Sequence, residues 1–143
     1  MPLPTSLAEL RQYAKQLNRE KYAHIPESAI PTTTFTDKNA NGLTNAIIYD
    51  LVHVRGGAAY RINNGATYDK ARGVYRAGVT KRGVPDIIGV LDGRFIGIEV
   101  KIGTDRQSVY QREVENEIRA AGGVYFIAKT YDDYAARIDA ATR

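Results

Sequence analysis

The feature that most restricts the fold is the dipeptide Asp92-Gly93, which lies between two runs rich in aliphatic residues, 84–91 and 94–101. Asp-Gly is a strong signal for a two-residue hairpin turn, because both residues tolerate the positive φ that such a turn needs. The residues that flank the turn must then pair with each other. Carried back along the strands, this register sets Asp86 opposite Glu99.

The predicted register sorts the hairpin into two faces, because side chains alternate across a strand. The first face gathers two carboxylates and an amine, those of Asp86, Glu99 and Lys101. Opposed carboxylates repel each other, and a divalent cation between them reverses the sign of that interaction. The second face is apolar and is suited to being covered by helices; it carries Ile87, Leu91, Ile96, Ile98 and Val100.

Composition narrows the kind of metal. The chain has no cysteine, and its only histidines are His24 and His53, so thiolate zinc sites are excluded and a histidine-built site is not expected. Oxygen ligands favour Mg²⁺ or Mn²⁺. Phosphodiester hydrolysis uses such an ion, and Lys101 could orient the attacking water or offset negative charge in the transition state.

A simpler interpretation of the same residues is a surface ion pair between Glu99 and Lys101, with Asp86 at a strand start. Glu-x-Lys is a common tripeptide and by itself favours that interpretation. The Pro85-Asp86 pair, the register match and the apolar setting, in which an unpaired charge is costly, favour the metal site.

A basic segment precedes the hairpin. Residues 55–82 include seven basic residues and a single acid, Asp69. Tyr60, Tyr68 and Tyr75 are interleaved with the basic residues. Basic side chains neutralise phosphates and tyrosine can stack on an unpaired base. The segment is either a solvated loop or a nucleic-acid-binding surface. For the second, we expect contacts from Lys70, Arg72, Arg76, Lys81 and Arg82, with Arg55 and Arg61 as the other basic residues.

Periodicity and cap signals predict one α/β fold, a small mixed sheet flanked by helices. We divide the chain into an N-terminal helix and linker, residues 1–38, and a second unit, 39–143, that carries the hairpin. The expected elements are a helix at 6–19, a helix from about 40 that ends at Gly56-Gly57, a strand at 58–62, an irregular hairpin within 67–79, the 84–101 hairpin, a helix at 108–121, a strand at 124–128 and a helix at 131–140.

The chain has no apolar run of the roughly 18 residues that a membrane-spanning helix needs, and its first residues lack the basic flank and apolar stretch of a secretory signal. We therefore expect a cytoplasmic protein without a membrane partner.

The motifs of the hairpin resemble those of the PD-(D/E)XK nucleases, with Pro85-Asp86 followed by Glu99-Val100-Lys101. More narrowly, the sequence is similar to the virus-type replication–repair nuclease (VRR-NUC) domain, which occurs in phage proteins and is akin to Holliday-junction resolvases. The resemblance runs from about Ala40 to Ala128 and includes residues 55–57, 60–63, 83–89, 99–101, 105–108, Gln111 and 121–124.

This resemblance implies a restriction-endonuclease-like core and a nuclease domain at 39–143. It assigns Asp86, Glu99 and the Val100 carbonyl as metal ligands and Lys101 as the catalytic lysine.

Three further residues are assigned less sharply. The resemblance suggests that Gln111 contributes to the site, although its spacing from Ser108 equally indicates a helix cap. Arg61 and Asn63 would bind phosphate at the mouth of the site, although they suit a strand end and a turn as well.

One departure concerns the helix before the first strand, where such nucleases usually carry an acid. Asn41 and Asn45 occupy this stretch, four residues apart and hence on one helical face. Either could offer a carbonyl oxygen to the metal, directly or through water. Asp37 and Asp50 are less well placed.

The leading hypothesis is a Mg²⁺-dependent DNA endonuclease, and the resemblance adds a preference for branched DNA in phage replication or recombination, in a bacterial cytoplasm. The alternative is a catalytically weak or inactive nucleic-acid-binding protein that retains the nuclease fold. A restriction-type endonuclease ranks last, because the chain has little room for a base-reading element. A homodimer would let two sites cut both strands of a branched substrate.

Overall fold

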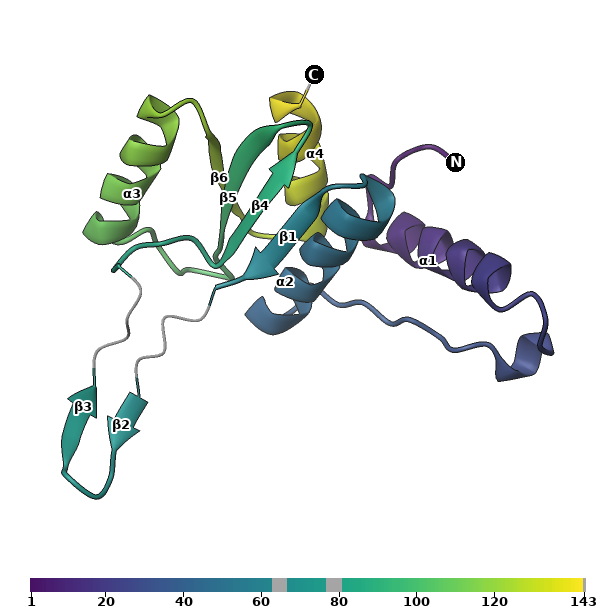
Figure 1. The fold of residues 1–143 in the computed structure, drawn as a ribbon, viewed down its shortest axis with the longest axis horizontal. Helices are drawn as coiled ribbons and strands as arrows, with labels where there is room; N and C mark the ends of the chain where they lie inside the picture. The colour runs from purple at the N-terminus through teal and green to yellow at the C-terminus, as the bar shows by residue number, and fades with distance from the viewer. Residues whose placement is uncertain (63–66, 77–80, 143) are drawn as a thin grey trace.

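The computed structural model describes residues 1–62, 67–76 and 81–142, and at 67, 68, 75 and 76 it describes the backbone alone. A four-stranded mixed sheet lies at its centre (Figure 1), in the order β1-β4-β5-β6. β1, β4 and β5 are antiparallel neighbours, and β6 runs parallel to β5. The predicted α/β class is confirmed. The strands are β1 (Ala58–Arg61), β4 (Ile87–Leu91), β5 (Arg94–Val100) and β6 (Val124–Ala128).

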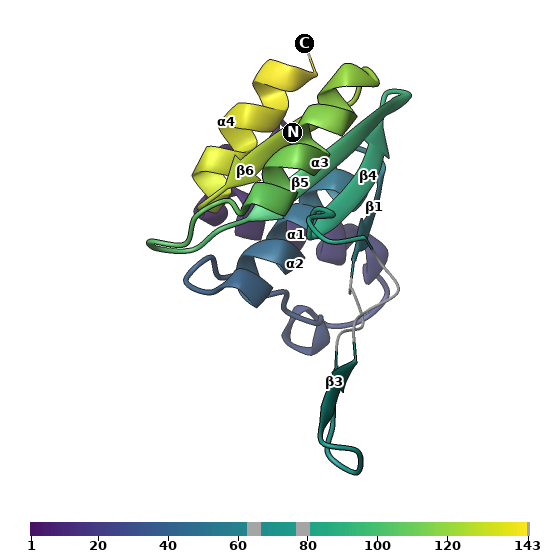
Figure 2. The ribbon, with the colours of Figure 1, turned by 90° about the vertical axis from the view of Figure 1, so that its left-hand side faces the viewer.

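Helices cover both faces of the sheet, with α2 and α4 on one face and α3 on the other (Figures 1 and 2). Each helix begins after a Ser, Asn or Thr whose side chain accepts the backbone N–H three residues on, as in a standard N-cap. None of the helices in the described ranges is long and apolar enough to cross a membrane. The helices are α1 (Leu7–Lys21), α2 (Ala40–Tyr49), α3 (Val109–Ala120) and α4 (Tyr131–Ala141), with a 3-10 turn at Glu27–Ala29 and a π-helical turn at Asp50–Val54 after α2.

The β4–β5 hairpin has the predicted register. Leu91 pairs with Arg94, and the ladder runs back to the pair Ile87–Ile98. Asp92 and Gly93 take φ values of 52° and 78°, both positive as a two-residue turn requires. The predicted apolar face is the core, where its side chains pack against α2 and α4. Its most buried members and their partners are Ile87, Ile96, Ile98, Leu43, Ile47, Tyr134 and Ile138.

β4 begins later than the sequence predicts, at Ile87. Pro85 has no backbone N–H to donate to the ladder, and Gly83 takes a φ of 86°, which glycine adopts freely. A Cβ on Gly83 would lie 2.2 Å from the carbonyl oxygen of Tyr110. The backbone at Gly83 therefore packs closely against the start of α3, and Asp86 lies just beyond it, at the end of the sheet.

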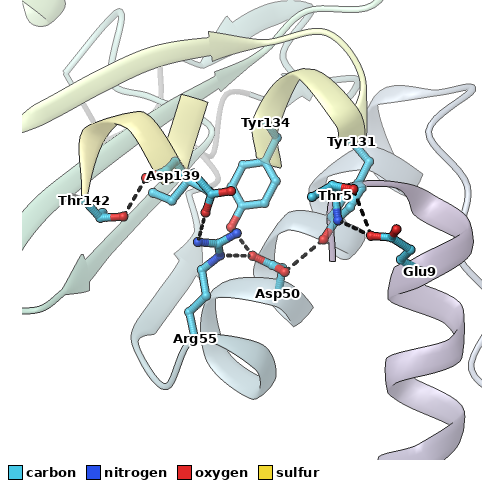
Figure 3. Close-up of polar contacts among 9 residues, drawn as sticks. Thr5, Glu9, Asp50, Arg55, Tyr131, Tyr134, Asp139 and Thr142 are labelled. Carbon is cyan, nitrogen blue, oxygen red and sulfur yellow. Dashed lines mark hydrogen bonds and ion pairs between the residues drawn. The ribbon is translucent and has the colours of Figure 1, made fainter. Parts of the chain in front are cut away.

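A buried polar network ties the π-helical turn to α4 (Figure 3). Asp50 is fully buried and accepts hydrogen bonds from the hydroxyls of Tyr131 at 2.9 Å and Tyr134 at 2.6 Å. Arg55 pairs with Asp50 at 2.6 Å and with Asp139 at 2.7 Å. Arg55, the first residue of the basic segment, is therefore part of the interior and not of a binding surface.

The hairpin expected within residues 67–79 is confirmed over its described part, as strands β2 (Thr67–Asp69) and β3 (Val74–Arg76). It extends away from the sheet in both views (Figures 1 and 2). The Asp69 carboxylate accepts the backbone N–H groups of residues 71 and 72 and shapes the turn. Lys70 and Arg72 are exposed at its tip.

Candidate active site

A pocket of about 500 Å³ opens at the end of the sheet, where β1 and β5 finish and β4 begins. Its wall is formed by residues far apart in the sequence, drawn from α2, the sheet and the start of α3. It brings together seven of the predicted site residues, namely Asn41, Arg61, Asp86, Glu99, Val100, Lys101 and Gln111.

The two predicted carboxylates lie in this pocket together. Glu99 is the penultimate residue of β5 and is 2% exposed. Asp86 precedes β4, so the ladder stops one residue short of the predicted pair. Its carboxylate instead accepts the backbone N–H of Val100 at 2.8 Å, and its carbonyl accepts that of Ile62 at 2.8 Å. These bonds hold the Asp86 side chain on the side of the sheet where Glu99 lies.

Glu99 is in an unfavourable environment for a carboxylate. Its Oε1 accepts a hydrogen bond from Gln111 at 2.8 Å and lies 3.9 Å from the Lys101 ammonium. Its buried Oε2 has no hydrogen-bond partner within the described part of the chain. Burial, and then the neighbouring charge of Asp86, raise the pKa of Glu99 to about 8. The pocket therefore disfavours a second negative charge in the protein alone.

These residues fit a hard divalent cation. A buried carboxylate oxygen without a partner, next to a second carboxylate, offers the oxygen ligands that Mg²⁺ and Mn²⁺ prefer. Within the described ranges no group of three or more Asp, Glu, His or Cys residues could hold a metal. An ion at this site would therefore have two carboxylate ligands, completed by neutral oxygens and water, which is the usual arrangement for Mg²⁺.

Gln111 has both of the roles that the sequence left as alternatives. Its Oε1 accepts the backbone N–H of Ser108 at 2.8 Å, which completes the capping box of α3. Its Nε2 donates to Glu99 at 2.8 Å. A single side-chain amide therefore caps the helix and fixes the rotamer of the buried carboxylate.

The asparagines on α2 contact Arg61. Both are exposed, and their Oδ1 atoms accept hydrogen bonds from the guanidinium, at 2.6 Å for Asn41 and 2.7 Å for Asn45. Neither of the other acids near this helix faces the pocket. Asp37 accepts the backbone N–H of Tyr131, and Asp50 belongs to the buried network.

The other basic residues predicted to bind nucleic acid, where the structure describes their side chains, lie outside the pocket wall. Lys81 pairs with Glu117 at 2.6 Å, both side chains being largely exposed. The Arg82 guanidinium lies 5.2 Å from the centre of the Tyr110 ring. Lys70 and Arg72 are on the β2–β3 hairpin. Asn63 and the side chain of Arg76 lie outside the described residues.

Asp105 also lines the pocket, from the turn that follows β5. It is not among the predicted site residues, since strand register says nothing about a loop. The only signal for it in the sequence is its place in the stretch 105–108 that the family resemblance includes.

Comparisons with known proteins add a likeness in fold. No protein-family model matches the sequence, and no curated protein matches it. The chain is similar to a solved structure described as a "VRR_NUC domain", with a TM-score of 0.49 and 16% sequence identity. The alignment covers 76% of this chain and 99% of that chain.

Proposed function

We propose that the protein is a metal-dependent nuclease that hydrolyses phosphodiester bonds in DNA at this pocket. The observation that carries the proposal is the buried Oε2 of Glu99, which has no hydrogen-bond partner among the residues that the structure describes and lies beside a second carboxylate, Asp86. Such an arrangement is costly in the protein alone and becomes favourable when a divalent cation is bound.

Asp86, Glu99 and the carbonyl of Val100 would hold Mg²⁺ or Mn²⁺. Such an ion would polarise the phosphate and lower the pKa of the attacking water. Gln111 keeps Glu99 in one rotamer through its 2.8 Å hydrogen bond. Lys101, with a side chain that is 12% exposed, keeps its ammonium at the pocket wall, where it can orient the water or stabilise the negative charge that develops on phosphorus-bound oxygens.

Charge on the surface supports a polyanionic substrate. The chain carries a net charge of +4, and Arg61 lines the same pocket as the carboxylates. Lys70 and Arg72 on the hairpin, and Arg82 beside α3, would neutralise phosphates farther along the DNA backbone. Lys81 and Arg72 would contribute less than Lys70 and Arg82, because Glu117 lies 2.6 Å from Lys81 and Asp69 lies 4.0 Å from Arg72.

The test is cleavage of end-labelled linear duplex, flap and four-way-junction DNA with Mg²⁺, with Mn²⁺ and with EDTA. We expect metal-dependent cleavage that Asp86→Asn abolishes while DNA binding is retained. Asp132→Asn is the matched control, since it removes the same charge from an exposed position at the start of α4. Binding without cleavage under every metal condition would refute the nuclease and favour the non-catalytic DNA-binding protein. The absence of an acid at Asn41 and Asn45 on α2, where such nucleases usually carry one, supports that alternative.

A preference for branched DNA, which the family resemblance supports, and a homodimer, whose two sites could cut both strands of a branched substrate, are part of the proposal. The same substrate panel tests the preference, which equal cleavage rates on linear and branched DNA would contradict. Sedimentation of the protein with and without junction DNA tests the dimer.

A further inference from the structure

Arg61, at the end of β1, lies across the first turns of α2. Its Nη1 donates to the Oδ1 of Asn41 at 2.6 Å, and its Nη2 donates to the Oδ1 of Asn45 at 2.7 Å and to the backbone carbonyl of Asn41 at 3.5 Å. Since the two asparagines are one helical turn apart, their amides grip the two ends of the guanidinium. This is a contact between elements that sequence periodicity does not reveal.

The Arg61 clamp, formed by Arg61 with Asn41 and Asn45, differs from most other arginine contacts in the molecule. Arg55, Arg119 and Arg137 each pair with a carboxylate. Among the residues that the structure describes, no carboxylate forms an ion pair with Arg61, which is held by three neutral oxygens. No ion pair within the described residues therefore matches its charge, and it is exposed at the wall of the pocket.

The same contacts bear on the metal. The Oδ1 atoms of Asn41 and Asn45 already accept hydrogen bonds from the Arg61 guanidinium, at 2.6 and 2.7 Å. If either oxygen also bound a metal ion, it would contact two cations at once. Repulsion between Arg61 and a divalent ion makes this unfavourable. An ion at Asp86 and Glu99 avoids the conflict, because it is bound by the carboxylates.

We propose that Asn41 and Asn45 are positioning residues and not metal ligands, and that they hold Arg61 in place to bind a non-bridging phosphate oxygen of the substrate. This rests on the proposed function, since it presupposes a nucleic-acid substrate in the pocket. The guanidinium is suited to the role because it is planar and always charged, and because its five N–H groups outnumber the three contacts of the clamp.

The first test is metal binding without DNA, measured from free Mn²⁺ by electron paramagnetic resonance. We expect Asn41→Ala, Asn45→Ala and the double variant to bind Mn²⁺ within twofold of the wild type, whereas Asp86→Asn weakens binding at least tenfold. Alanine has a higher helix propensity than asparagine, so these variants should keep α2 intact. A tenfold loss of Mn²⁺ affinity in either asparagine variant would make that residue a ligand and overturn the proposal.

The second test is binding of duplex DNA in EDTA as a function of salt. Removing one phosphate contact by Arg61→Gln should lower the slope of log affinity against log salt by about 0.9. The affinity should fall about tenfold, as for the loss of a charged hydrogen bond. The double asparagine variant should show part of this loss of DNA affinity. Arg61→Lys should also bind DNA more weakly than the wild type, because an ammonium cannot reach both amides.

Lys15→Gln is the matched control, since it removes one exposed positive charge from α1. Wild-type DNA affinity in the double asparagine variant, combined with a loss in Arg61→Gln, would refute the positioning role.

The two proposals fail in different ways. Cleavage by the wild type, together with loss of Mn²⁺ binding in the asparagine variants, leaves the nuclease standing and removes only the positioning role. No cleavage and no Mn²⁺ binding removes the nuclease, while the salt slope still decides whether the Arg61 clamp contacts phosphate. Absence of any DNA binding overturns both.

Discussion

The raised pKa of Glu99 predicts that metal-free protein gains stability when this carboxylate is neutralised. Glu99→Gln removes the charge, keeps the shape of the side chain and leaves an oxygen that can accept the Gln111 hydrogen bond. We expect the variant to be more stable than the wild type in EDTA at neutral and alkaline pH. The two proteins should converge near pH 5.

The size of the stability difference follows from the difference between the folded and unfolded pKa values of Glu99, and its sign follows from the direction of that pKa shift. The folded protein holds the Glu99 proton more tightly than the unfolded chain, so stability is highest below the unfolded value of 4.5 and falls as pH rises towards about 8. At about 1.4 kcal/mol for each pH unit, the penalty is about 3 kcal/mol at pH 7 and at most about 5 kcal/mol above pH 8. Glu99→Gln should recover most of it.

Urea unfolding in EDTA between pH 5 and pH 9 measures this difference, with Asp132→Asn as the surface control. Adding Mn²⁺ should stabilise the wild type much more than Glu99→Gln, because only the wild type presents both carboxylates. A stability difference between the two proteins that stays constant across the pH range would refute the reasoning. It would mean that Glu99 has the same pKa in the folded and the unfolded protein.

Three further substitutions test other parts of the structure. Tyr134→Phe removes the 2.6 Å hydrogen bond to the buried Asp50 carboxylate and should cost about 2 kcal/mol in urea unfolding, as for a hydrogen bond to a charged group. Gly83→Ala should destabilise the protein more than Gly93→Ala, because both positions have positive φ but only at Gly83 would the new Cβ meet a backbone oxygen, at 2.2 Å; equal effects on the melting temperature would contradict this. Lys101→Ala should reduce the cleavage rate at least about 100-fold while Mn²⁺ affinity stays or rises, and a parallel loss of Mn²⁺ binding would show that the lysine acts structurally.

The β4–β5 hairpin could be predicted because its determinants are local. A two-residue turn allows one register, and the register decides which side chains share a face. Even the error at the start of β4 is local in origin, since Pro85 and the positive φ of Gly83 delay the strand. Asp86 and Glu99 nevertheless meet in the same pocket.

The contacts around the carboxylates could not be predicted in the same way. The spacing of Gln111 from Ser108 indicates a cap but cannot show that the other end of the amide reaches Glu99. The charge pattern of the basic segment does not distinguish Arg55 from Arg61. The fold buries the first against Asp50 and leaves the second at the pocket.

The sequence by itself therefore determined the helices, the hairpin, its register and the identity of the two carboxylates in the pocket, because periodicity, caps and turn chemistry act over a few residues. Only the tertiary structure decided the protonation of Glu99, the double role of Gln111 and the pairing of the α2 asparagines with Arg61. Burial and charge act through space, between residues that the chain separates widely, and their strength is set once the helices have packed on the sheet.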